Sequence, residues 1–306
     1  MITVESVSKS FNGKPAVDHI SFEAKDQETF VLLGTSGCGK TTTLKMINRL
    51  IEADSGNILI NGKNIRDQKP EELRMGIGFV MQHSGLFPHY TIQQNITVVP
   101  ELLKWDKKKT MDRIHELLHK LHLSEEILSR YPNELSGGQQ QRVGIARALM
   151  ADSPILLMDE PFGALDTITK TDIHSEFKSL EEIRNKTIIL VTHDVQEAFE
   201  LGHRICLMDK GKIIQTGSPK EMIYHPLNDF VRDFFAQNRL LLEYKISALR
   251  DLELSPDEKE FYHQFDFTEQ TPVWNALQKL SSEHQHSVYY ETLIKAFNDY
   301  RKLQIV

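Results

Sequence analysis

A glycine-rich string near the start of the chain has the residue types that cradle phosphate. GTSGCGKTT at 34–42 stands between an apolar run and a stretch with helical spacing. Glycines let the backbone curl so that its N–H groups point inward at phosphate oxygens, and the helix that follows adds the positive end of its dipole. We expect Lys40 to reach the β- and γ-phosphates of ATP and the Thr41 hydroxyl to ligate Mg²⁺. The candidate ATP-binding residues of the string are Gly34, Thr35, Ser36, Gly37, Cys38, Gly39, Lys40, Thr41 and Thr42.

Two carboxylates end the apolar run ILLMDE at 155–160. Such a run is typical of a buried strand, and ligands of α/β sheets collect at the carboxyl ends of the strands. Asp159 is expected to hold Mg²⁺, directly or through water. Glu160 is expected to polarise the attacking water, because hydrolysis of a phosphate needs an oriented nucleophile more than covalent help. Together with the phosphate-binding string, this pair predicts ATP hydrolysis.

A second backbone cradle is indicated by LSGGQQQRV at 135–143. A serine and two glycines precede a helical stretch, which places free N–H groups at a helix N-terminus. One triphosphate rarely needs two anion cradles unless they close on it from opposite sides. The residues concerned are Leu135, Ser136, Gly137, Gly138 and Gln139.

Short apolar runs alternate with helical patterns and predict an α/β fold with a mainly parallel sheet covered on both faces. The long interval from about 83 to 150 has mostly helical patterns. It therefore resembles a helical insertion rather than part of the sheet. The expected strands lie near 2–7, 29–33, 57–60, 77–81, 154–158, 187–191, 204–208 and 212–215.

The composition is that of an ordinary globular protein of 306 residues, with a formal net charge of −7 and two cysteines. The negative charge and the lack of a long Lys/Arg run argue against nucleic acid as the main ligand. Isolated thiols fit a reducing cytosol. No stretch approaches the ~20 apolar residues that span a bilayer, so any membrane partner must supply the spanning segments.

The character of the chain changes past about residue 238, where the glycines that recur before residue 218 disappear. SPDE at 255–258 and TPVW at 271–274 both place a hydroxyl residue before proline, which is a helix-start signal. We therefore expect a main domain at 1–238 and a small α/β appendage at 239–306.

The loop at 34–42, LSGGQ at 135–139 and the strand ending in two carboxylates at 155–160, in that order along the chain, resemble the nucleotide-binding subunit of ATP-binding-cassette (ABC) transporters over roughly residues 1–236. The resemblance assigns roles to four further residues. Phe11 in SKSFNG stands where the family stacks an aromatic ring on adenine. Gln82 in FVMQH resembles the family's Q-loop, which touches Mg²⁺ and the attacking water. Asp166 in GALD resembles the loop that communicates across the dimer, and His193 in VTHD resembles the switch histidine at the γ-phosphate.

The resemblance implies a P-loop NTPase fold with a parallel core, an antiparallel β part and a helical subdomain at about 83–150. It also implies that two copies sandwich two ATP molecules, each between the 34–42 loop of one copy and the 135–139 segment of the other. Closure would drive integral-membrane permease subunits, with a substrate-binding protein acting through them. The expected location is the cytoplasmic face of a bacterial cell membrane.

A narrower resemblance is to the ATPases of quaternary-amine importers for glycine betaine, carnitine and choline. It is carried by the segments at 45–56, 84–105, 131–149 and 158–170. The segment 84–105 is where the family docks on its membrane partner. Importers of this group often end in paired CBS modules, whereas 240–306 has room for at most one truncated or atypical module.

Alternatives to this reading come from other classes of protein. HELLH at 115–119 matches a zinc-protease pattern, but an apolar stripe through 111–121 marks a core-facing helix and leaves the motif on its wetter side. The same engine would serve an exporter of bile acids or toxic compounds. A soluble cassette ATPase of translation or DNA repair and a non-enzymatic ATP sensor also stay open.

Overall fold

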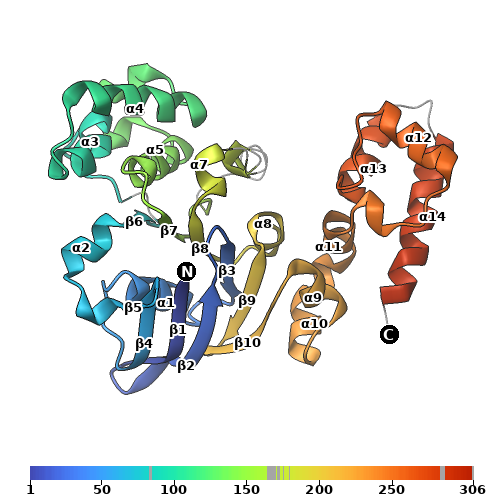
Figure 1. The fold of residues 1–306 in the computed structure, drawn as a ribbon, viewed down its shortest axis with the longest axis horizontal. Helices are drawn as coiled ribbons and strands as arrows, with labels where there is room; N and C mark the ends of the chain where they lie inside the picture. The colour runs from blue at the N-terminus through green and yellow to red at the C-terminus, as the bar shows by residue number, and fades with distance from the viewer. Residues whose placement is uncertain are drawn as a thin grey trace. The chain divides into compact units, whose positions relative to one another are not determined.

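The computed structural model describes residues 1–82, 85–163, 170, 173–174, 176–178, 180–282 and 287–304. The chain divides into two compact units, Met1–Ile214 and Gln215–Val306. Figure 1 shows the first unit as two sheets with a group of helices, and the second as helices. The expected boundary at 238/239 differs from this division and stays a prediction.

The main sheet brings together strands that are far apart in the sequence. Its order among the described residues is β10-β9-β3-β8-β7-β6. The strands from β9 to β6 pair in parallel, and every residue of β3, β7 and β8 is buried, as expected for a sheet covered on both faces. The strands are β3 (Thr29–Gly34), β6 (Ile77–Val80), β7 (Ile155–Asp159), β8 (Thr187–Thr192), β9 (Arg204–Asp209) and β10 (Lys212–Gly217).

An antiparallel sheet of order β2-β1-β4-β5 packs its apolar side chains into the same core. That core includes Ile2 and Phe22 of this sheet, Leu32 of β3 and Leu44 of the first helix. All of the strands expected from the sequence are confirmed, whereas β2 and β5 were not expected. The strands here are β1 (Ile2–Phe11), β2 (Lys14–Ala24), β4 (Ser55–Ile60) and β5 (Lys63–Asn64).

The helical interval is confirmed for the described residues between 85 and 150. α3 (Ile92–Leu102), α4 (Lys107–Lys120) and α5 (Gly137–Leu149) lie together, away from the antiparallel sheet in Figure 1. Short 3₁₀ turns, η2 (Glu125–Ser129) and η3 (Pro132–Glu134), connect α4 to α5. The remaining helical segments of this unit are α1 (Lys40–Ile47), η1 (Ile65–Asp67), α2 (Pro70–Met75), α7 (Glu181–Arg184) and α8 (Val195–Leu201).

The C-terminal segment corrects the expectation of an α/β appendage. Where 239–304 is described, it forms helices, and its one extended pairing is an isolated bridge between Ala248 and Pro272. Apolar side chains from helix faces fill the core, so no sheet is needed to bury them. Both expected helix starts are confirmed, at Pro256 and Val273. A CBS-like module in this segment stays a prediction.

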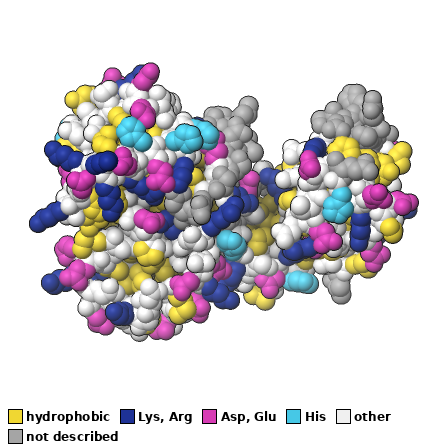
Figure 2. Space-filling model, turned by 45° about the horizontal axis from the view of Figure 1, so that its top comes forward, with side chains coloured by type: hydrophobic (Ala, Val, Ile, Leu, Met, Phe, Trp, Pro, Cys, Tyr) yellow, Lys and Arg dark blue, Asp and Glu magenta, His cyan; other side chains and the backbone are white. Residues whose placement is uncertain are grey.

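The helices of the second unit follow one another with short connections. They are α9 (Pro219–Tyr224), α10 (Asp229–Phe235), η4 (Ala236–Asn238), α11 (Arg239–Ile246), η5 (Leu249–Asp251), α12 (Pro256–Gln264), α13 (Val273–Ser282) and α14 (Ser287–Gln304). In the parts of the chain that are described, no helix is long and apolar enough to cross a membrane. Figure 2 shows basic and acidic side chains interspersed over the face it displays.

One buried side chain of α3 holds the loop that leads into this helix. Asn95 is fully buried, and its Oδ1 accepts from the Phe87 N–H at 2.7 Å. Its amide donates to the carbonyl oxygens of Phe87, Tyr90 and Thr91 at 3.0–3.2 Å. Loop carbonyls inside a protein need such donors, because a buried polar group without a partner is costly. Asn95 therefore fixes the loop from Phe87 to Thr91 on the helical subdomain.

We expect Asn95→Ala to lower the free energy of unfolding by about 3 kcal/mol, because it strips several buried backbone groups of their partner. Urea unfolding followed by circular dichroism measures the change. Gln93→Ala, an exposed position on the same helix, should cost less than about 0.5 kcal/mol. Equal effects of the two substitutions would show that Asn95 does not hold the loop.

Candidate nucleotide-binding site

The phosphate-binding string forms a tight loop between β3 and α1 that only glycine permits at two positions. Gly34 and Gly39 have positive φ angles of 152° and 104°. A Cβ atom on Gly34 would lie 2.2 Å from the carbonyl oxygen of Met208, and one on Gly39 would lie 2.5 Å from that of Ala16. The backbone therefore passes too close to its neighbours to carry a side chain, and it keeps the curled shape expected of an anion cradle.

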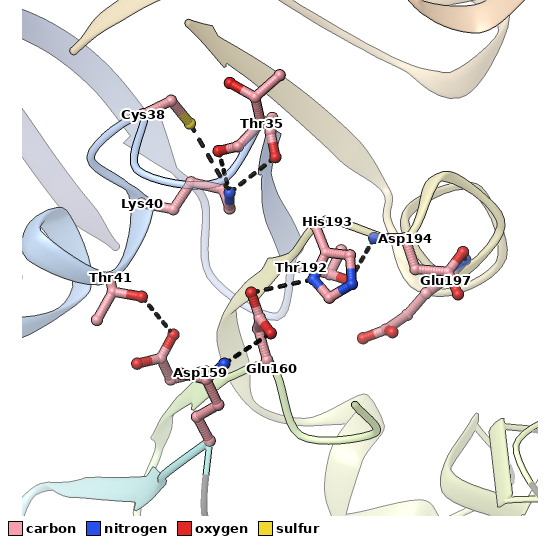
Figure 3. A network of polar contacts seen from close by, with 12 residues as sticks. Thr35, Cys38, Lys40, Thr41, Asp159, Glu160, Thr192, His193, Asp194 and Glu197 are labelled. Atoms are coloured by element: carbon pink, nitrogen blue, oxygen red, sulfur yellow. Dashed lines mark hydrogen bonds and ion pairs between the residues drawn. The ribbon is translucent and has the colours of Figure 1, made fainter. Parts of the chain in front are cut away.

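The Lys40 ammonium lies inside this loop. Nζ donates to the carbonyl oxygens of Gly34 at 2.7 Å and Thr35 at 2.9 Å, and it lies 3.7 Å from the Cys38 sulfur (Figure 3). The side chain belongs to the first residue of α1 and is buried. A buried cation held only by neutral oxygens is ready to exchange one of them for an anionic phosphate oxygen.

The Thr41 hydroxyl and the Asp159 carboxylate lie side by side. Thr41 Oγ1 donates to Asp159 Oδ1 at 2.8 Å, where the second residue of α1 meets the end of β7. Burial raises the pKa of Asp159, although the hydrogen bond from Thr41 opposes that rise. Hydroxyl and carboxylate oxygens are the ligands that Mg²⁺ prefers, so the side chains present fit this ion.

Glu160 is held from two sides. Gln82 Nε2 donates to its Oε2 at 2.9 Å, and His193 Nδ1 lies 3.1 Å from its Oε1 (Figure 3). Glu160 has a left-handed backbone with φ of 46°, and its N–H donates to the carbonyl oxygen of Val191 on β8. Such a conformation is costly for a residue other than glycine and is often found at functional sites. The structure thus brings together three of the residues singled out in the sequence.

The segment 135–139 is built as a helix N-terminus. Ser136 Oγ accepts from the Gln139 N–H at 3.3 Å, and Gln139 Oε1 accepts from the Ser136 N–H at 3.0 Å, which is a capping box. Ser136 and Gly137 are exposed. Within the described part of the chain, no hydrogen bond or ion pair joins this segment to the phosphate loop. Its exposed residues, Ser136 and Gly137, are therefore accessible to a group from outside the chain.

Gln141, which no sequence motif singled out, connects α5 to the backbone of the candidate catalytic residue Glu160. This side chain is buried, and its Nε2 donates to the backbone carbonyl of Glu160 at 3.4 Å. It lies in the run of glutamines after the two glycines, but nothing in that run distinguishes it from its neighbours. Gln141 therefore links the 135–139 cradle to the end of β7 within one copy.

Of two other candidate residues, the structure describes Phe11 but not Asp166. Phe11, at the end of β1, is 45% exposed, with Lys9 Nζ 5.6 Å from the centre of its ring. An open aromatic face of this kind can stack on a base. Asp166 lies outside the described residues, so its role stays a prediction.

The HELLH string forms ion pairs within the helical subdomain. His115 Nδ1 lies 2.5 Å from Glu125 Oε1, and Glu116 pairs with Arg113 and Lys120 at 2.7 Å each. Over the described ranges, no three His, Cys, Asp or Glu side chains gather in a group that could hold a metal ion. The pairing explains these residues as surface charges of α4.

We expect Asp159→Asn to raise the thermal midpoint of the nucleotide-free protein at neutral pH by about 3 °C. The reason is that burial raises the pKa of Asp159, so stability is lost as the pH rises from the ordinary pKa through the raised one, and asparagine carries no charge. Differential scanning calorimetry measures the difference, which should vanish toward about pH 4.

Asp112→Asn, at an exposed position of α4, is the matched control and should leave the midpoint unchanged. A midpoint at neutral pH that falls on the Asp159→Asn substitution would contradict the burial argument.

This chain is similar in sequence and fold to known proteins. The family model described as ABC transporter matches residues 17–163. The glycine betaine/carnitine/choline transport ATP-binding protein OpuCA of Bacillus subtilis is 53% identical over 79% of this chain and 64% of its own length. The osmoprotectant import ATP-binding protein OsmV of Salmonella typhimurium is 51% identical over 82% of this chain and 68% of its own.

A solved structure is also similar to this chain in fold and sequence. The ATP-binding cassette MJ0796, a dimer in a post-hydrolysis state with ADP and Pi, is 33% identical, with a TM-score of 0.65 over 71% of this chain and 98% of that one. The chain spans somewhat less than two thirds of the length of the Bacillus subtilis relative. The extent of these matches, together with the loop, the paired carboxylates and the capped glycine helix, shows that the chain belongs to the family of ABC transporter ATP-binding proteins.

Proposed function

We propose that this chain hydrolyses Mg-ATP and thereby powers an importer of osmoprotectants such as glycine betaine, carnitine or choline. The single observation that carries the ATPase proposal is the position of Glu160, held between Gln82 and His193 directly after the Asp159–Thr41 pair. The solute class is supported by the transport functions after which the two relatives are named, since they are about half identical to this chain in sequence.

The residues of the phosphate loop bind and orient the substrate. Lys40 exchanges its loop carbonyl contacts for phosphate oxygens, and the N–H groups of the loop donate to the same phosphates. Thr41 and Asp159 would hold Mg²⁺, and Gln82, which contacts the neighbouring Glu160, would be a further ligand. The bound ion supplies positive charge that offsets the charge developing on the phosphate oxygens. Phe11 stacks on the adenine.

Glu160 orients the attacking water and accepts its proton. Its two side-chain oxygens are fixed by an amide donor and an imidazole, so the carboxylate cannot rotate freely. A carboxylate fixed in this way holds water in line with the last phosphorus, which is the main contribution a protein makes to phosphoryl transfer. His193 contacts this carboxylate and would also donate to the γ-phosphate, the role that the family resemblance assigns to it.

A second copy of the chain completes the site. The exposed Ser136 and the N–H groups of Gly137 and Gly138 form a helix N-terminus suited to an anion, and nothing in the described part of this copy occupies it. The dimeric state of the related cassette supports this arrangement. Each ATP would then lie between the phosphate loop of one copy and the 135–139 segment of the other, with Asp166 at the dimer interface.

An apolar groove on the first unit is the proposed docking site for the membrane subunits. The groove has a volume of about 490 Å³, and its lining includes Met81, Phe87, Val98, Val99 and Arg147. Met81 and Phe87 of its lining are each more than two fifths exposed, so the groove presents apolar surface to a partner. Permease subunits bound here would place the chain at the cytoplasmic face of the membrane, with a substrate-binding protein acting through them.

We expect Glu160→Gln to reduce ATP turnover by at least about 10³-fold, because the amide cannot accept the proton of the attacking water. ATP affinity should change little, and the variant should accumulate as an ATP-bound dimer. Phosphate release and light scattering after gel filtration measure the two effects. Glu71→Gln, an exposed position, should behave like the parent. If Glu160→Gln turned over ATP as fast as the parent, Glu160 would not be a catalytic residue.

We expect Phe87→Asp to weaken capture of the membrane subunits by at least about tenfold, because it places a charge in an apolar groove. Co-purification with the permease from detergent-solubilised membranes measures the loss. Leu227→Asp is the matched control, since this residue is 72% exposed and lies outside both the groove and the segment 84–105. If both variants capture the permease as the parent does, the groove is not the docking site.

A further inference from the structure

Lys170 follows Asp166 by four positions in the sequence and has no part in the chemistry proposed so far. Its ammonium reaches two carboxylates in the segment after His193. Nζ lies 2.5 Å from Asp194 Oδ2 and 3.2 Å from Glu197 Oε2. The Lys170 side chain is only 17% exposed, so the contacts form away from bulk water and are weakly screened. This lysine therefore contacts two of the residues that follow the candidate switch histidine.

His193 has little that holds it in place. Its side chain is 62% exposed, and within the described part of the chain its one polar contact is with Glu160. The residue stands between the end of β8 at Thr192 and the start of α8 at Val195. The position of the imidazole is thus set mainly by the backbone on either side of it.

Asp194 fixes that backbone through three contacts. Its Oδ1 accepts from the N–H groups of Gln196 at 2.8 Å and Glu197 at 3.2 Å, which caps α8. Its own N–H donates to Thr192 Oγ1 at 2.9 Å. The remaining oxygen, Oδ2, receives Lys170. The lysine thereby holds the carboxylate that orders both flanks of His193.

Glu197 explains why a cation is required here. It is 2% exposed, and its Oε1 has no hydrogen-bond partner. Burial raises the pKa of Glu197, and the Lys170 charge opposes that rise. A buried carboxylate is tolerated only when a counter-charge lies close to it. Lys170 therefore joins the buried first turn of α8 to the half-buried cap residue Asp194 beside His193.

We propose that Lys170 is a positioning residue that, through Asp194, fixes His193 at its contact with Glu160. The inference rests on the proposed function, in which His193 and Glu160 act on the terminal phosphate and the attacking water. It adds a specific role for a lysine that acts only through another side chain. Loss of the contact would let the start of α8 shift and the imidazole move away from the carboxylate.

The test combines Lys170→Met, which keeps most of the apolar side chain and removes the charge, with Glu197→Gln, so that no buried carboxylate loses its cation. Glu197→Gln alone keeps the contact of Lys170 with Asp194 and is the matched control. In the full-length protein, we expect the double variant to lose about 10- to 100-fold in kcat for ATP hydrolysis, with KM for ATP changed less than about twofold. Lys170→Arg should keep kcat within about threefold, because a guanidinium can contact both carboxylates.

The position of His193 is measured without reference to turnover by NMR of the histidine side chains, with His193→Ala identifying the signals. The double variant should shift the His193 signals, and Glu197→Gln should leave them as in the parent. Turnover and His193 signals in the double variant that match those of Glu197→Gln would overturn the positioning role. An inactive parent protein would refute the proposed function, whereas the NMR comparison would still decide the role of Lys170.

Discussion

The contact of one carboxylate with two side chains from different strands organises this site. Glu160 reaches Gln82 at 2.9 Å and His193 at 3.1 Å, although the three residues are far apart in the sequence. They meet because β6, β7 and β8 are neighbours that run in parallel, so their carboxyl ends share one edge of the sheet. Any change in the order or direction of these strands would separate the water-activating group from the groups that hold it.

In the absence of nucleotide, several features of the site lower the stability of the folded protein. Lys40 is a buried cation held by neutral oxygens, Asp159 is a buried carboxylate, and Glu160 has a left-handed backbone. Each feature opposes folding, and the apolar core between the two sheets must offset the cost. A bound triphosphate with its metal ion would give both Lys40 and Asp159 a partner of opposite charge. Nucleotide binding is therefore expected to stabilise this edge of the main sheet.

The catalytic edge was predictable from the sequence because its signals are local. The string at 34–42, the carboxylates ending the run at 155–160 and the serine before two glycines each lie within about ten residues, where spacing alone implies geometry. The mainly parallel sheet follows from the alternation of strand and helix patterns, whereas the order of its strands was not predicted. Gln82 and His193 were assigned from the family resemblance, and their contacts with Glu160 agree with that assignment.

Other features depend on contacts between distant segments and could not be predicted. Gln141 differs from the glutamines beside it only through its buried contact with Glu160, and Lys170 differs from other lysines only through Asp194 and Glu197. The expected α/β appendage was wrong because short apolar runs after residue 238 fit a strand as well as a buried helix face. Only the packing of those faces into one core distinguishes the two.

The proposed mechanism depends on one ATP that binds to the phosphate loop of one copy and contacts the 135–139 segment of another copy. Glu160 of the first copy would face the γ-phosphorus of this ATP. The most direct measurement is a crystal structure of the hydrolysis-deficient protein with Mg²⁺ and ATP. We expect the γ-phosphate to contact Lys40 and His193 of one copy and Ser136 of the second. A triphosphate bound without Lys40, or without any contact to a second copy, would contradict this account.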